Sequence, residues 1–174
     1  MISQAAAPLA VAAAAFLAVL LWRVRPRWPW RPQNRELARA LHEARVRVAA
    51  ARDGPERARA LCDAADLVGR RAALLGGWSR VAVLFGRAVR ADPRSPAVVT
   101  RSIAALAERP RELESLLWRH LALAPWTEAP DAVRASLRAL RSLYEGPIRR
   151  SARARALERA EEVLRECTEG TRAR

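Results

Sequence analysis

The first 22 residues contain no ionisable side chain, and this run limits what the chain can fold into more than any other feature. A helix over residues 1–22 would be roughly 33 Å long at about 1.5 Å per residue, enough to cross a hydrocarbon core of about 30 Å. Leucine, valine and phenylalanine each favour insertion by roughly 0.3–0.6 kcal/mol, while the nine alanines of this run add little. The run therefore predicts a single transmembrane helix.

A secretory signal peptide is the alternative for this segment. Such a peptide carries positive charge before its apolar run and a small-residue cleavage site after it. Here the order is reversed, because no charged side chain precedes the run and five arginines follow it by residue 35. An uncleaved anchor is favoured, and the positive-inside rule places everything after residue 22 in the cytoplasm. We therefore expect a single-pass membrane protein with a cytoplasmic C-terminal domain.

Residues 23–34 are rich in arginine, tryptophan and proline. Tryptophan suits the boundary between water and hydrocarbon, and each arginine near anionic headgroups contributes about 1 kcal/mol. The prolines oppose a continuing helix and favour a stiff, extended stem. We expect a juxtamembrane stem over 23–34, and we expect these residues at the membrane interface: Trp22, Arg23, Arg25, Arg27, Trp28, Trp30 and Arg31.

The cationic residues are 32 arginines and no lysine, and the formal net charge is +14. A protein selected to bind phosphate usually mixes the two cations, because lysine serves well as a point charge. The arginine excess therefore fits the compositional bias of a GC-rich genome and does not by itself indicate a nucleic-acid partner. Alanine, leucine and arginine favour helix, and runs of β-branched or aromatic residues are almost absent. The composition predicts an all-α fold.

Proline and glycine divide residues 35–167 into segments with apolar residues at helical spacing. The connections are short, and short connections force neighbouring helices to run antiparallel. A domain of antiparallel helices over 35–167 is therefore predicted, followed by a disordered tail over 168–174. The expected helices cover about 35–52, 55–75, 78–91 and 96–108, one that starts at Pro110, one that ends near Tyr144, and a last one from Ile148 to Cys167.

The middle of the chain repeats itself. "LFGRAVRADP" (84–93) aligns with "LLWRHLALAP" (116–125), and "SPAVVTRSIAAL" (95–106) aligns with "APDAVRASLRAL" (129–140). A period near 34 residues, in helix pairs that end with proline, resembles the tetratricopeptide repeat. Its positions are occupied by Gly69, Phe85, Ala88 and Pro93 in the first copy, and by Leu117 and Pro125 in the second.

The first helix of the repeat departs from the family pattern, because Ala65, Val68 and Ala72 stand where the family has larger side chains. The resemblance covers about residues 55–145. It implies helix pairs stacked as a short tetratricopeptide-like solenoid, with Phe85 buried inside its pair and Leu117 at the matching place in the next.

A concave surface lined by the first helix of each pair also follows from the resemblance. Its charged side chains would prefer an acidic peptide, held by arginine forks on carboxylates. The partner-binding residues implied in this way are Asp63, Asp66, Arg70, Arg134 and Arg138.

Motifs for catalysis and cofactor binding are absent from the sequence: it has no glycine-rich nucleotide loop, P-loop or nucleophile elbow. His42 and His120 are alone on their helices, and Cys62 and Cys167 share no metal-ligand or redox spacing. We therefore predict no enzymatic activity, no catalytic residue, no cofactor and no metal site.

The sequence thus favours a membrane-anchored scaffold or adaptor that binds a protein partner, through an acidic segment of that partner. The alternative is a basic peripheral protein that binds anionic lipid or nucleic acid. Nucleic acid is the least favoured partner, because the basic stretch at 149–159 contains no aromatic residue on which bases could stack.

Overall fold

The computed structural model describes residue 16, residues 32–75 and residues 77–172. All regular structure within these residues is α-helical, and they contain no strand, so the expected all-α fold is confirmed for this part of the chain. The contacts divide the chain into two units, Met1–Ala38 and Arg39–Arg174.

The predicted anchor apart from Phe16, most of the predicted stem and all seven predicted membrane-interface residues lie outside the described residues. None of the helices that the structure describes combines the length and the apolar character needed to cross a bilayer.

The described helices follow the boundaries expected from proline and glycine closely. The largest differences are at four ends: α2 begins at Pro32, within the predicted stem, α5 stops at Ala105, and α8 begins at Ser151 and ends at Arg172. The helices are α2 (Pro32–Ala50), α3 (Gly54–Leu75), α4 (Trp78–Ala91), α5 (Pro96–Ala105), α6 (Pro110–Leu123), α7 (Pro130–Glu145) and α8 (Ser151–Arg172).

Short-range signals fix where these helices start. Proline occupies the first turn of α5, α6 and α7, where its missing N–H costs no hydrogen bond. At the start of α3, Asp53 Oδ1 accepts from the backbone N–H of Glu56 at 2.7 Å, and Glu56 Oε2 accepts from the N–H of Arg52 at 3.0 Å. This reciprocal pair is a variant of the capping box, which satisfies two donors that the first turn leaves free.

Two glycines are required at the ends of the α3–α4 pair. Gly77 precedes α4 with φ of 104°, a left-handed conformation that side chains disfavour. At the other end, a Cβ on Gly54 would lie 2.4 Å from the carbonyl oxygen of Ala91, the last residue of α4. The start of α3 therefore touches the backbone at the end of α4, and only glycine permits this approach.

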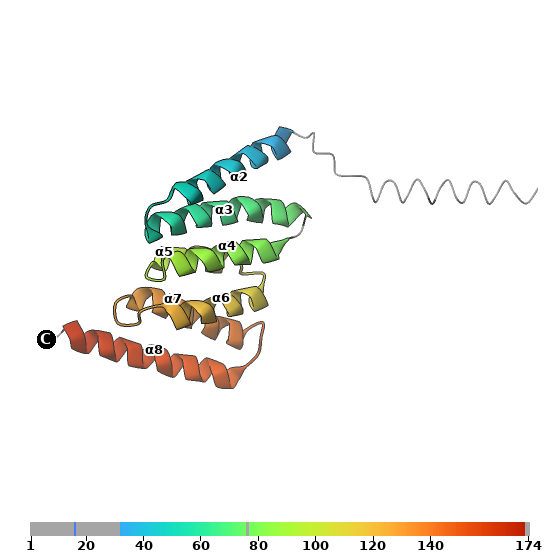
Figure 1. Ribbon diagram of the computed structural model, residues 1–174. Helices are drawn as coiled ribbons and strands as arrows, with labels where there is room; N and C mark the ends of the chain where they lie inside the picture. Colours follow the sequence, from blue (N-terminus) through green and yellow to red (C-terminus); the bar gives the residue numbers. More distant parts are fainter. Residues whose placement is uncertain (1–15, 17–31, 76, 173–174) are drawn as a thin grey trace, which may run out of the picture. The chain divides into compact units, whose positions relative to one another are not determined.

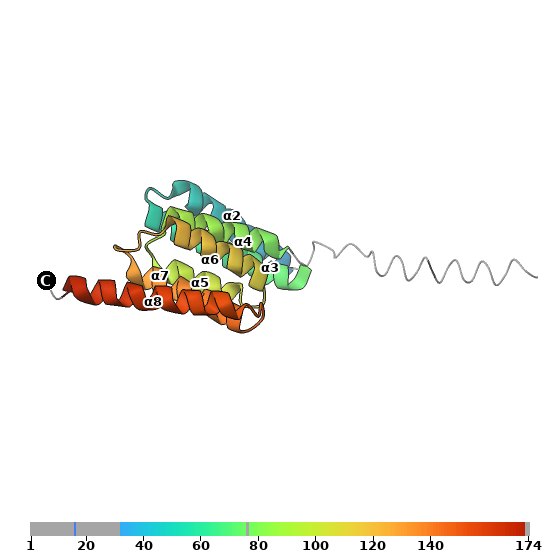
Figure 2. The ribbon, with the colours of Figure 1, turned by 90° about the horizontal axis from the view of Figure 1, so that it is seen from below.

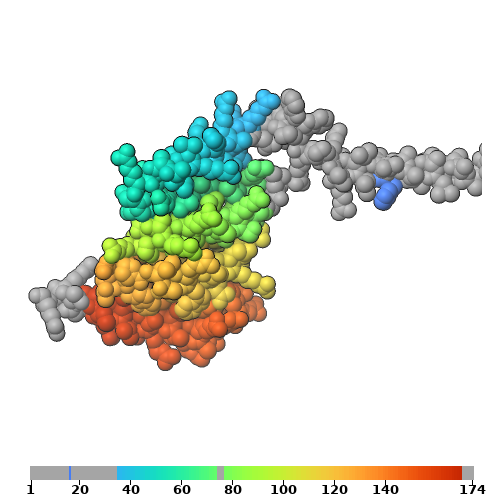
Figure 3. Space-filling model, in the orientation of Figure 1, coloured from blue at the N-terminus to red at the C-terminus, as the bar shows by residue number. Residues whose placement is uncertain are grey.

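The helices of the second unit succeed one another from α3 to α8 in chain order, as the ribbon and the space-filling view show (Figures 1 and 3). Helices α3, α5 and α7 contact one another in series, and α4 contacts α6 (Figure 2). Between these two rows, α4 packs on α3 and α5, and α6 packs on α7. Helix α8 packs on α7 and ends the stack. The unit is therefore a layered arrangement of helices around a shared core.

The core lies between the two rows of helices. Phe85 of α4 and Leu117 of α6 are both fully buried, as predicted. Every buried side-chain nitrogen and oxygen within the described residues has a hydrogen-bond partner. The apolar interior is thus closed around these side chains, without the cost of an unsatisfied polar group.

Helix α8 continues past Cys167 to Arg172, through residues that the sequence predicted to be a disordered tail. Leu164 is buried in the core, which fixes this part of the helix. Arg165 pairs with Glu162 one turn earlier at 3.5 Å, and Thr168 Oγ1 donates to the carbonyl of Arg165. Packing and local pairing extend the helix where no apolar repeat marked it in the sequence.

The burial of Phe85 sets its expected contribution to stability. Phe85→Ala should lower the free energy of unfolding of a fragment covering residues 32–174 by about 3–5 kcal/mol, because the substitution leaves a cavity. Val83, two residues earlier on α4, is 52% exposed, and Val83→Ala should stay within about 0.5 kcal/mol of the parent. Chemical denaturation followed by circular dichroism measures both. Equal midpoints for Phe85→Ala and the parent would show that the core is misassigned.

Candidate protein-binding groove

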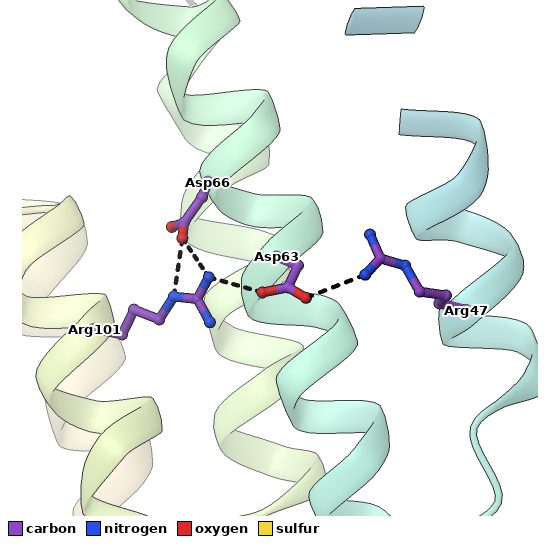
Figure 4. A network of polar contacts seen from close by, with 4 residues as sticks. All are labelled: Arg47, Asp63, Asp66 and Arg101. Carbon is purple, nitrogen blue, oxygen red and sulfur yellow. Dashed lines mark hydrogen bonds and ion pairs between the residues drawn. The ribbon is translucent and has the colours of Figure 1, made fainter. Parts of the chain in front are cut away.

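Asp63 and Asp66, two of the predicted partner-binding residues, lie one turn apart on α3 and share an arginine of α5 (Figure 4). Arg101 Nη2 is 2.8 Å from Asp63 Oδ1 and 2.6 Å from Asp66 Oδ2, and Arg101 Nε donates to the same Asp66 oxygen at 2.9 Å. Arg47 of α2 lies 3.5 Å from the other oxygen of Asp63. The network joins three helices.

This network neutralises the two carboxylates within the chain. Partial burial works against the charge of Arg101, but the hydrogen bonds to Asp63 and Asp66 outweigh it and raise the Arg101 pKa above its ordinary value. Because all the side chains are partly exposed, each ion pair contributes only about 0–1 kcal/mol. A partner would have to displace Arg101 to reach Asp63 or Asp66. Arg70, one turn further along α3, is exposed and forms no ion pair with a described residue.

Cys62 is buried beside this network. Burial raises the pKa of its thiol to about 11; Arg101 lowers the pKa, and Asp66 and Asp63 raise it further. The thiol therefore stays protonated at neutral pH and packs as a small apolar side chain. It is not a candidate nucleophile.

Arg134 and Arg138, the other two predicted residues, lie on α7 and line an open groove against α8. Arg134 pairs with Asp131 one turn earlier at 2.9 Å, and Arg138 Nε donates to Glu161 of α8 at 2.5 Å. Within the part of the chain that the structure describes, no hydrogen bond or ion pair joins them to the α3 carboxylates. The structure thus divides the predicted site: two carboxylates lie around Arg101 of α5, and two arginines lie in the α7–α8 groove.

The α7–α8 groove has a volume of about 1080 Å³ and runs between the first half of α7 and the second half of α8. Val163 is 58% exposed in it, and Trp126, from the α6–α7 connection, is 40% exposed. Arginines outnumber carboxylates in its wall. Its apolar lining comprises Trp126, Pro130, Ala160, Val163 and Leu164, and its charged lining comprises Arg134, Arg138, Arg159, Arg165, Asp131 and Glu169.

A second cavity of about 490 Å³ lies between α6 and the first half of α8, and it is almost entirely apolar. Both cavities are lined by Trp126 and Ala160, so they follow one another along α8. Trp118 of α6 is 43% exposed and lines the second cavity. We refer to the two cavities together as the α8 trough.

Both tryptophans of the α8 trough are held in place through their indole N–H groups. Trp118 Nε1 donates to Tyr144 Oη at 2.9 Å, and Trp126 Nε1 donates to the carbonyl of Leu121 at 2.9 Å. Tyr144 Oη in turn donates to Glu114 at 2.6 Å, and Arg153 lies over the Tyr144 ring. The polar end of each indole is satisfied inside the protein, which leaves its apolar surface for contact with a ligand.

Sequence reasoning missed Arg101 and both trough tryptophans. Arg101 is one arginine among many, and nothing in its sequence neighbourhood distinguishes it. Trp126 stands in "APWTEAP", which reads only as a connection between helices. An aromatic side chain inside a proline-bounded turn was the one available signal, because connections are usually polar.

His120 and Ser136 form a buried pair that resembles part of a hydrolytic site in its geometry. His120 Nδ1 lies 2.7 Å from Ser136 Oγ, and Nε2 lies 2.8 Å from the carbonyl oxygen of Pro93. A carbonyl only accepts, so Nε2 carries the proton and Nδ1 accepts from the serine. Both side chains have no exposed surface. The pair therefore bridges α6, α7 and the α4–α5 connection, and no substrate can reach it.

Within the described residues, no group of three or more His, Cys, Asp or Glu side chains is placed to hold a metal ion.

The burial of His120 predicts a pH dependence of stability. Desolvation lowers the pKa of His120, and the hydrogen bond to Pro93 offsets this only in part. The folded state therefore binds the proton less readily than the unfolded state. The contribution of His120 to the free energy of unfolding is fully present above the unfolded pKa of about 6.5 and is lost as the pH drops below it. The unfolding midpoint of residues 32–174 should therefore decrease between about pH 7.5 and pH 5.5.

His120→Gln should remove most of this dependence, whereas His42→Gln, at an exposed position on α2, should keep it. Denaturation at several pH values with each variant makes the comparison. A slope that survives in His120→Gln would assign the dependence to another group.

No protein-family model, no curated protein and no solved structure matches the chain.

Proposed function

We propose that this chain is a membrane-anchored adaptor that binds a segment of a protein partner in the α8 trough. The main support for the proposal is the trough itself, which combines exposed tryptophans, held by hydrogen bonds, with an arginine-rich wall. Tryptophan and arginine are the residues that most often dominate the energetics of protein interfaces. We therefore propose a binding site and not a catalytic one.

The shape and charge of the trough favour an amphipathic, acidic helix as the bound segment. Its lining on α8 runs from Arg153 to Glu169, which is about 24 Å at 1.5 Å per residue, or about four helical turns of ligand. An apolar floor accepts side chains spaced three and four residues apart. Arg159 forms no ion pair with a described residue, and it can bind a ligand carboxylate without losing an internal partner.

We also propose that α3–α4 and α5–α6 are two tetratricopeptide-like helix pairs. The series of contacts α3–α5–α7 supports this, as do the equivalent buried positions of Phe85 and Leu117 in α4 and α6. In such an array the first helices of the pairs line one surface. Asp63, Asp66 and Arg70 stay predictions for a second contact on that surface.

The membrane anchor is the remaining part of the proposal. It is supported by the uncharged run at 1–22 and by the arginines that follow it. On the positive-inside rule the helical domain lies in the cytoplasm. Anchoring would hold the trough close to the membrane, where a partner on the same surface meets it at a raised effective concentration.

The α8 trough can be tested with a synthetic peptide of about 16 residues, the length of about four helical turns. Leucines occupy one face of the peptide and glutamates flank them; the probe is labelled and its binding is followed by fluorescence anisotropy. Trp126→Ala should weaken binding by about thirtyfold, the effect of losing about 2 kcal/mol at an interface centre. Arg138→Ala should weaken binding without changing the fold, because its side chain is exposed.

Two controls make this test specific. The same peptide with lysine in place of glutamate should bind weakly, because the wall of the trough repels it. Arg45→Ala, at an exposed position on α2, should leave binding unchanged. Equal affinity for the acidic and basic peptides, or no effect of Trp126→Ala, would reject the trough as the site.

The anchor predicts that the full-length protein stays in the membrane fraction after an alkaline carbonate wash, because an apolar span is held by the bilayer and not by charge. A deletion of residues 1–22 serves as the control and should be released. Recovery of the full-length protein in the supernatant, or a mature N-terminus within the apolar run, would rule out an uncleaved anchor.

A further inference from the structure

The outward side of α4 carries a stripe of arginines. Arg80, Val83, Arg87 and Arg90 follow one another at intervals of three and four residues, so they share one side of the helix. All four are exposed, and Val83 is 52% exposed. The opposite side of the helix is buried in the core.

Arg119 of α6 extends this stripe onto the neighbouring helix. A methyl group at Gly86 would lie 3.2 Å from Arg119 Nη1, so the guanidinium of Arg119 lies directly over α4. The two helices pack side by side (Figure 2). We name the surface formed by Arg80, Val83, Arg87, Arg90 and Arg119 the α4 face.

The α4 face differs from the arginines that connect helices, because its guanidinium groups have no carboxylate partner within the described residues. Arg101, Arg138 and Arg153 each pair with a carboxylate on another helix. Helix α4 contains no acidic residue, and none of the four arginines of the α4 face forms an ion pair with a described residue. Their positive potential is therefore directed outward without internal neutralisation.

We infer that the α4 face binds the surface of an anionic lipid bilayer. Guanidinium groups bind phosphate and carboxylate oxygens with paired hydrogen bonds, which are the groups that acidic headgroups present. Each arginine near such a surface raises partitioning by about fivefold. Val83, between the arginines, can enter the headgroup region. The stripe contains no aromatic residue on which a base could stack, so a nucleic acid has less to bind.

This contact goes beyond the proposed adaptor function. The α4 face and the α8 trough share no residue, so lipid binding and partner binding are separable by mutation. A domain held against the bilayer through α4 would present its other surfaces in a defined orientation.

The test uses the full-length protein with lipid nanodiscs. A nitroxide label is placed at Val83→Cys in a Cys167→Ser background, and its collision rate with a water-soluble nickel chelate is measured. We expect the label to be shielded in discs that contain phosphatidylserine at low ionic strength. Shielding should be lost in discs of phosphatidylcholine alone and at high salt, because screening removes the attraction. A label at Ser142→Cys, exposed on α7, should stay accessible throughout.

Charge-reversal variants distinguish binding by the α4 face from a general attraction due to the protein's net positive charge. Arg80→Glu, Arg87→Glu and Arg90→Glu together should abolish the shielding at position 83. Arg45→Glu, Arg52→Glu and Arg155→Glu change the net charge equally at exposed positions elsewhere and should preserve it. If the first combination unfolds the domain by circular dichroism, the corresponding arginine-to-glutamine variants replace it and should give the same loss.

Three results would overturn the inference. The first is equal shielding in phosphatidylcholine discs, and the second is shielding that persists without the three arginines. The third is shielding that appears only when double-stranded DNA or RNA is added, which would assign the α4 face to a nucleic acid. Because the label reports on α4 alone, none of these results depends on peptide binding in the α8 trough.

Discussion

The close contact between α3 and α4 is the constraint on which the rest of the helical unit depends. Helix α3 presents small side chains to the core, among them Ala58, Cys62 and Ala65, while α4 contributes the large Phe85. Gly54 brings the first turn of α3 against the backbone at the end of α4. Small residues allow two helices to approach closely, and interiors of this kind pack as densely as organic crystals. Helix α5 then packs on both members of the pair, and α7 packs on α5.

Arginine has three different roles in this structure, and its surroundings decide which. Arg101 connects helices by binding two carboxylates, although such exposed pairs add little stability each. Arg134 and Arg138 are paired yet still line a groove, so they contribute to the potential of the α8 trough. The arginines of the α4 face have no carboxylate partner in the described residues. The same residue type therefore forms ion pairs between helices, gives one groove a positively charged wall, and forms an outer surface whose charge no described carboxylate neutralises.

The α8 trough follows from the way the stack ends. Helix α8 packs on α7, whereas cavities separate it from parts of α6 and from the first turns of α7. An interior helix would have neighbours on these sides. At the end of the stack, the apolar side chains of α8 meet two tryptophans whose N–H groups are already satisfied. The result is an apolar surface held rigid by internal hydrogen bonds, which lowers the entropy lost when a ligand binds.

Residue type and spacing alone were sufficient to predict the all-α class and most of the helix boundaries. Proline has no N–H to lose in a first turn, and glycine adopts positive φ, so both act locally and independently of the fold. The same locality made Phe85 and Leu117 predictable as core residues, because their periodicity is a property of a single helix. The end of α8 was not predictable in this way, since residues 168–172 owe their helical state to pairing and to the buried Leu164. Only the tertiary structure could decide which charges meet: it joined Asp63 and Asp66 to Arg101, residues 38 and 35 positions away along the chain. It also placed Arg138 beside Trp126 in one groove, because contacts between helices depend on how the helices stack and not on the sequence of any one of them.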